Sequence, residues 1–180
     1  MMDNKKSIFQ QAGEWGIPFG LYLSCGAVTF LFADLFAPLS LVFLVLMLCT
    51  PLVVYYFQRR RFIMDDGFTE FAARWMLGIM LFILGTVLSS LVAYLLLQYV
   101  RPDFIQHQAE AAVEAYKKIP QMRDGEFVKV LQMMIEKKML PTPIEMVFNV
   151  FWLVTFVGSV TSAITALLAQ RPLPKYRIKR

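Results

Sequence analysis

The side chains that could hold a metal ion are few in this chain and lie far apart. The single histidine, His107, shares a polar region with several methionines, a combination that suits soft metal ions. Two of these methionines, Met133 and Met134, are adjacent and therefore point to different faces of a helix. Apolar packing explains Met134 better than coordination does, so the sequence predicts no metal and no cofactor.

The adjacent acids Asp65 and Asp66 form a second candidate, since paired carboxylates serve in acid–base catalysis and in metal–phosphate chemistry. They follow three consecutive arginines, Arg59, Arg60 and Arg61, and precede an apolar helix. In this position Asp66 is better explained as the N-cap of that helix. No GxSxG or HExxH motif and no glycine-rich phosphate loop occurs. The sequence therefore predicts no catalytic residue and a protein that is not an enzyme.

Long apolar stretches dominate the chain, and the helices that they form must position its polar residues. Apolar residues make up 58% of the sequence, well above the share usual in soluble domains. Four stretches are each long enough as a helix to cross a hydrocarbon core of about 30 Å. We therefore predict an all-α integral membrane protein that forms one membrane domain over residues 1–180. The predicted spans cover about 15–33, 38–57, 75–100 and 144–168.

The distribution of lysine and arginine predicts how these spans are oriented. Eleven of the 18 cations lie in the two terminal tails and the 59–74 loop, and seven lie in the 101–143 loop. The positive-inside rule then places both termini in the cytoplasm, beside an anionic inner leaflet. This topology explains the basic pI of about 9.3 without nucleic acid. The predicted cytoplasmic basic face comprises Arg59, Arg60, Arg61, Arg171, Lys175, Arg177, Lys179 and Arg180.

The 101–143 loop is predicted to be helical and extracytoplasmic. Apolar residues recur at helical spacing after Ile105 and again after Phe127, with charged residues between them. The two amphipathic helices could form a lid over the span ends, lie in the outer headgroup region, or dock a partner. The sequence leaves these three arrangements open.

Inside the spans, small residues are more informative than ionisable ones. Asp34, Arg74, Arg101 and Glu145 fall at span ends, where we expect their side chains to reach water. A carrier driven by protons or ions would need such a group at mid-depth. Small residues instead form two stripes at helical spacing, which either pack spans within one subunit or face a partner or second copy. These stripes are Gly16, Gly20 and Ser24 in the first span and Gly158, Ser162 and Ala166 in the fourth.

Three short segments give the chain a family resemblance. They are residues 15–21 (WGIPFGL), 66–71 (DGFTEF) and 99–103 (YVRPD). With the order of spans and the helical outer loop, they resemble the bacterial four-span family DUF4199, a domain of unknown function. The resemblance implies no catalytic residue. It implies a membrane subunit for a polyprenyl-phosphate glycosyltransferase, because genes for this family often neighbour one.

The functional hypotheses from sequence fall into three classes. The first is a non-enzymatic membrane subunit or scaffold that positions a partner, with the glycosyltransferase at the cytoplasmic face as the partner that the resemblance implies. The alternative is a small lipid-handling or transport-related protein, with a groove between the third and fourth spans. The last is an enzyme whose site at the outer face would involve His107 and loop carboxylates.

Overall fold

The computed structural model describes residues 7–65, 68–119, 125–137 and 139–170, and all its regular structure is helical. One turn of π-helix, η1 (Leu96–Val100), extends α3. This confirms the predicted all-α class. The six α-helices are α1 (Ile8–Leu31), α2 (Ala37–Met64), α3 (Phe71–Leu95), α4 (Phe104–Lys117), α5 (Glu126–Glu136) and α6 (Pro143–Leu168).

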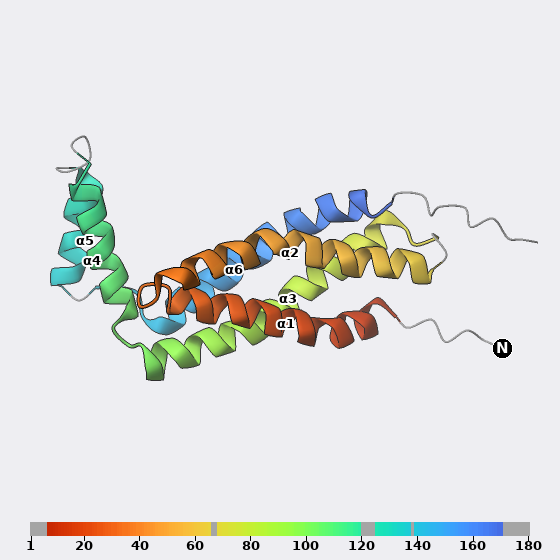
Figure 1. Cartoon of the computed structure of the whole chain (residues 1–180), viewed down its shortest axis with the longest axis horizontal. Helices are drawn as coiled ribbons and strands as arrows, with labels where there is room; N and C mark the ends of the chain where they lie inside the picture. The colour runs from red at the N-terminus through yellow and green to blue at the C-terminus, as the bar shows by residue number, and fades with distance from the viewer. Residues whose placement is uncertain (1–6, 66–67, 120–124, 138, 171–180) are drawn as a thin grey trace, which may run out of the picture.

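The four long helices run side by side, and the two short ones lie across one end of them. Figure 1 shows α1, α2, α3 and α6 along the long axis of the molecule, with α4 and α5 as a pair at the end where α1 meets α2. α3 is central, because it packs along both α1 and α6. α1 begins and α6 ends at the opposite end of the bundle.

The helix boundaries follow from local capping chemistry. Pro38 lies in the first turn of α2 and Pro143 opens α6, where a missing N–H costs nothing. Ser7 and Thr142 each form a capping box with a residue three positions later. The helix of the first span thus begins at Ile8, earlier than the apolar run at 15–33 indicates.

The predicted start of the third helix needs a correction. Asp66 lies outside the described residues, and the N-cap of α3 is Glu70. Asp65 instead closes α2 as its C-cap, and its carboxylate accepts hydrogen bonds from Arg61 and Thr69. At the other end of α3, the chain leaves the helix at Arg101, because the residue before a proline disfavours the helical backbone.

Aromatic and aliphatic side chains fill two separate cores within the bundle. The larger core joins α1, α2 and α3, and the rings of Phe19 and Phe82 meet edge to face there with centroids 5.2 Å apart. The smaller core lies at the α4 end and consists of Leu31, Leu97, Phe104 and Val147. It fixes the base of α4 to α1, α6 and η1.

The bundle has the surface of a membrane protein. Three of its helical segments, α2, α3 with η1, and α6, are long and apolar enough to cross a bilayer. Their outward-facing leucines, valines and phenylalanines are largely exposed, which only lipid or another apolar surface can accommodate. α1 is not among the three, and Gln10, Gln11 and Glu14 occupy its first two turns.

Candidate functional site

The small-residue stripe of α1 lies in the interface with α3. Gly16, Gly20 and Ser24 are all buried, and the Ser24 hydroxyl donates to the Gly20 carbonyl at 2.7 Å. A Cβ added at Gly20 would lie 2.8 Å from Leu88 Cδ2 and 3.3 Å from Gly85 Cα. The two backbones therefore approach so closely that the contact requires glycine on both helices.

The stripe of α6 is buried in the same way against the other side of α3. A Cβ at Gly158 would lie 2.3 Å from Phe82 Cγ, and one at Gly78 would lie 1.8 Å from Ser162 Oγ. Ala166 is fully buried. The side chains of α3 and α6 therefore interdigitate along this stripe.

Both predicted stripes thus pack against α3 of the same chain. Of the two interpretations that the sequence left open for them, the structure places all six residues in packing within one subunit. A second protein could reach Gly16, Gly20 or Gly158 only if the bundle came apart.

A buried polar cluster ties α2, α3 and α6 together near the end of the bundle away from α4. The Gln58 amide Nε2 donates to Ser162 Oγ at 3.0 Å, to the Ser162 carbonyl at 3.1 Å and to the Arg74 carbonyl at 3.3 Å. The Ser162 hydroxyl donates to the Trp75 carbonyl at 3.1 Å. Gln58 and Ser162 are fully buried, so these bonds hold in an environment that excludes water.

Arg74 is the residue whose setting differs most from the prediction. Expected at a span end with its head group in water, it is 1% exposed. Its Nη1 donates to the Thr69 carbonyl, and its guanidinium carbon lies 4.9 Å from the centroid of the Phe62 ring. Among the described residues, its Nε and Nη2 have no hydrogen-bond partner. The chain therefore holds a buried cation mainly by a carbonyl and an aromatic face.

One sequence signal could have indicated the burial of Arg74. Arg74, Gly78, Leu81 and Gly85 recur at four, three and four residues, so they share one stripe of α3. The other three members of the stripe are apolar or small and pack on α1, α2 or α6. An arginine that begins such a stripe faces the bundle and cannot turn to water without leaving it.

The arginines that end α2 are anchored to neighbouring helices. Arg59 donates to the Ala169 carbonyl at 2.9 Å, and its guanidinium carbon lies 5.3 Å from the Phe62 ring centroid. Arg60 lies over the ring of Trp15 at 5.6 Å. The predicted basic face thus also closes the bundle, because these cations join α2 to α6 and to α1.

Arg61 completes this set of contacts. Its Nε donates to the Asp65 carboxylate at 3.2 Å, and its Nη1 donates to the Gln11 side chain. The remaining members of the predicted basic face lie outside the described residues. They are Arg171, Lys175, Arg177, Lys179 and Arg180.

The opposite end of α3 carries an arginine with a carboxylate partner. Arg101 donates to both oxygens of Asp34, Nη1 to Oδ1 at 2.6 Å and Nη2 to Oδ2 at 2.7 Å, and Nη1 also donates to the Leu31 carbonyl at 2.7 Å. This hydrogen bonding lowers the pKa of Asp34 below its ordinary value of 3.8. Asp34, Arg101 and His107 line a shallow pocket of about 280 Å³.

Nothing in the described part of the chain assembles a metal site of histidine, cysteine and carboxylate side chains. No group of three or more His, Cys, Asp and Glu side chains there could hold a metal ion. Cys25 is exposed and Cys49 half-buried, and both lie within apolar helices. The chemistry that the geometry does support is helix association and the holding of cations at the two ends of α3.

Comparison with known proteins gives one match. A family model described as "Protein of unknown function (DUF4199)" matches residues 14–171, which is most of the chain and includes all six helical regions apart from the start of α1. No curated protein and no solved structure matches. The chain therefore belongs to the DUF4199 family.

Proposed function

We propose that this protein is a non-enzymatic membrane subunit that binds and positions a partner protein in the bacterial inner membrane. In this proposal α1 is the fourth span, and both termini are cytoplasmic. The length of α1, 24 residues, and its packing along α3 support this arrangement. The arginines that end α2 support the orientation, because cations at that level face the anionic leaflet.

The observation that carries the proposal is the uneven packing of α2. Its buried residues are Val54, Gln58 and Phe62, all in its second half. The first half of α2 leaves most of its leucines and valines facing outward, and Leu41 and Leu48 are 67% and 68% exposed. Because the small-residue stripes are occupied within the chain, this half of α2 is the long helical surface most available to another membrane helix.

The partner that we propose is a polyprenyl-phosphate glycosyltransferase acting at the cytoplasmic face, as the family resemblance implies. Its membrane helices would pack on the first half of α2. The arginine-rich end of the bundle would lie at the level of the cytoplasmic headgroups, where such an enzyme would meet its phosphorylated substrate.

The test is photo-crosslinking in the native membrane followed by gentle extraction. A photoreactive amino acid is placed at Leu41 or Leu48 of α2, and at Phe156 of α6 as the matched exposed control. We expect one stoichiometric protein adduct from both α2 positions and none from Phe156. If all three positions capture the same scattered proteins, and deletion of the gene leaves the glycosyltransferase at its normal membrane level and activity, the proposal is wrong.

A further inference from the structure

The short helices α4 and α5 form a hairpin that leaves the bundle sideways. They pack on each other, and Val113 of α4 and Val128 of α5 are only 6% and 3% exposed. The rings of Tyr116 and Phe127 meet edge to face with centroids 5.2 Å apart. Figure 1 shows the pair running across the direction of the long helices and extending beyond them on one side. The hairpin therefore does not form the lid over all the span ends that one interpretation of the sequence expects.

One face of this hairpin is apolar and uncovered by the rest of the chain. Phe127, Val130 and Met134 are spaced by three and four residues and share one side of α5. Phe127 is 59% and Val130 53% exposed, and neighbouring Tyr116 is 36% exposed. We call Tyr116, Ile119, Phe127, Val130 and Met134 the apolar face of the hairpin.

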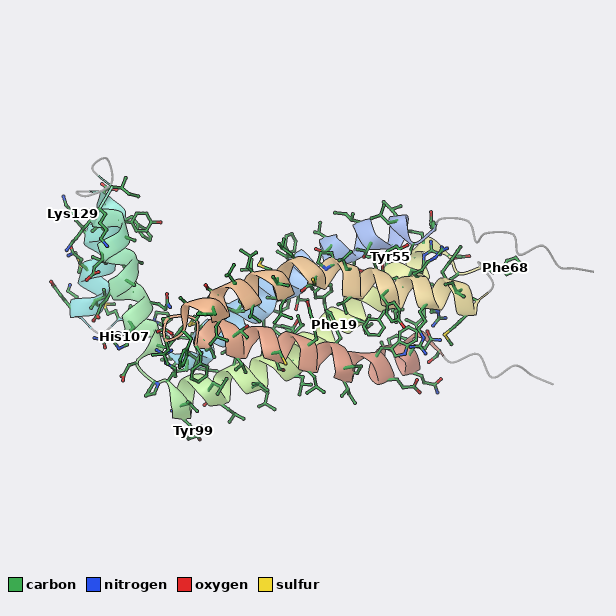
Figure 2. The ribbon with its side chains drawn as sticks, in the orientation of Figure 1. Phe19, Tyr55, Phe68, Tyr99, His107 and Lys129 are labelled. Atoms are coloured by element: carbon green, nitrogen blue, oxygen red, sulfur yellow. The ribbon has the colours of Figure 1, made fainter. Side chains whose placement is uncertain are left out.

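The other face of the hairpin is polar. Between α4 and α5 it has a shallow groove of about 320 Å³, lined by Glu110, Glu114, Gln132 and Glu136 together with two apolar residues. Lys129, on the side of α5 opposite Phe127, points away from the bundle in Figure 2. The apolar face consequently points toward the side on which the long helices lie.

The base of the hairpin is fixed at the level where the spans end. Phe104 is fully buried in the smaller core, and Arg101 is bound by Asp34 at the turn between α1 and α2. Tyr99, just before this point, is 76% exposed at the end of the apolar segment and points away from the hairpin in Figure 2. The hairpin therefore leaves the bundle at the level where the exposed apolar surface of the spans ends.

We propose that the α4–α5 hairpin lies flat beside the bundle in the bilayer leaflet at the Arg101 end of α3, which is the outer leaflet in the topology proposed above. Its apolar face is immersed at the boundary between headgroups and acyl chains, and its acidic groove faces water. An amphipathic helix pair lying across the spans at their ends has the geometry of an interfacial element. The occupant of the apolar face is lipid, because that face continues the lipid-facing surface of the spans.

The charge of the hairpin determines which force can attract it to the bilayer. In its described residues 104–119 and 125–137, four lysines (Lys117, Lys118, Lys129, Lys137) balance four glutamates (Glu110, Glu114, Glu126, Glu136). Anionic headgroups therefore gain little from binding it, and burial of apolar side chains must supply the free energy. The immersion should accordingly persist in neutral lipid and at high salt.

The test measures depth with a fluorescent probe on the full chain in nanodiscs of neutral phosphatidylcholine. Cys25 and Cys49 are replaced by alanine, and an environment-sensitive dye is attached to a single cysteine at position 127 or 130, or at 129 as the matched control. We expect iodide in water to quench the dye at Phe127→Cys and Val130→Cys about threefold less than at Lys129→Cys. Nitroxide on the lipid near the headgroup should show the reverse order.

Three outcomes would overturn the proposal. Equal quenching by iodide at 127, 130 and 129 would show that the apolar face is in water. Protection from iodide without quenching by the nitroxide lipid would show that a protein, such as a second copy, covers it. Protection that arises only with anionic lipid would contradict apolar immersion. Two dye positions on the apolar face guard against local misfolding at one of them, and none of these results depends on a partner of α2.

Discussion

The two ends of α3 hold their arginines by different means. Arg101 has a carboxylate partner, with both guanidinium nitrogens on Asp34, and keeps part of its side chain in contact with solvent. Arg74 is buried, lies over the Phe62 ring and donates to a backbone carbonyl. The end at Arg101 is thus electrostatically complete within the chain, whereas the end at Arg74 is held by packing.

This difference shows which forces make each end rigid. At the Arg74 end, α2, α3 and α6 meet around Gly78, and the polar cluster depends on backbones that touch. At the Arg101 end, a salt bridge and a small core join the turn between α1 and α2 to the base of α4. Substitutions that add side-chain volume should therefore destabilise the Arg74 end most. Substitutions that remove a charge should destabilise the Arg101 end most.

The largest effect is expected from Gly78→Ala. The added Cβ would lie 1.8 Å from Ser162 Oγ and 2.7 Å from Gln58 Nε2, so α3 and α6 must separate and the polar cluster must break. Overpacking of this kind costs about 1–3 kcal/mol in the free energy of unfolding. The thermal midpoint in detergent should fall clearly. Gly26→Ala is the matched control, because nothing lies within 4 Å of its Cβ, and an equal loss in both variants would contradict this account.

Asp34→Asn should have the next largest effect, because it leaves Arg101, like Arg74, without a carboxylate partner. The amide keeps the shape of the carboxylate but removes its charge, and one of its two groups cannot accept a hydrogen bond from Arg101. A bidentate ion pair that is partly exposed contributes about 1 kcal/mol. Unfolding in detergent should show a loss of that size. Asp103→Asn, two residues from Arg101 in the sequence, is the control. If Asp34→Asn is as stable as the wild type, the ion pair contributes nothing to stability.

The sequence alone predicts the helices of this fold but not all their orientations. Pro38, Pro143 and the Arg-Pro pair at 101–102 lie at helix boundaries in the structure, and such boundaries can be predicted because proline and capping act locally. The same is true of the amphipathic helices α4 and α5, whose faces follow from periodicity. Their sideways direction could not be predicted, since periodicity identifies an apolar face but not where the helix points.

The setting of Arg74 was also beyond a span-by-span analysis. A long cationic side chain near a span end normally extends to the headgroups. Arg74 cannot, because the stripe that it begins is covered by α1, α2 and α6. Gln58 and Ser162, which cover the start of the stripe, belong to α2 and α6, so this burial depends on how the helices pack. The small-residue stripes, in contrast, were recognisable because close helix packing requires small side chains wherever it occurs.

A smaller effect is expected from Ser162→Ala at the Arg74 end. The variant removes the hydroxyl that accepts from Gln58 and donates to the Trp75 carbonyl, yet Gln58 keeps the carbonyls of Ser162 and Arg74. Hydrogen bonds between membrane helices contribute about 0.6 kcal/mol on average. The free energy of unfolding in detergent should therefore fall by less in Ser162→Ala than in Gly78→Ala. Ser40→Ala, on an exposed hydroxyl in α2, is the control, and a loss as large as that of Gly78→Ala would mean that the hydroxyl, not the volume, dominates.

The smallest effect is the dependence of stability on pH at the Arg101 end. Because Arg101 lowers the pKa of Asp34, the folded chain binds this proton less readily than the unfolded chain. The stabilisation is therefore complete above the ordinary pKa of 3.8 and is lost as the pH falls through the lower folded value. Other carboxylates titrate in the same range, so the informative quantity is the difference between the wild type and Asp34→Asn. That difference in thermal midpoint should be constant above about pH 5 and shrink below about pH 4, since protonated Asp34 and the asparagine that replaces it are both neutral. A difference that grows as the pH falls would show that Asp34 is stabilised in its protonated form and that the two arginines are held alike.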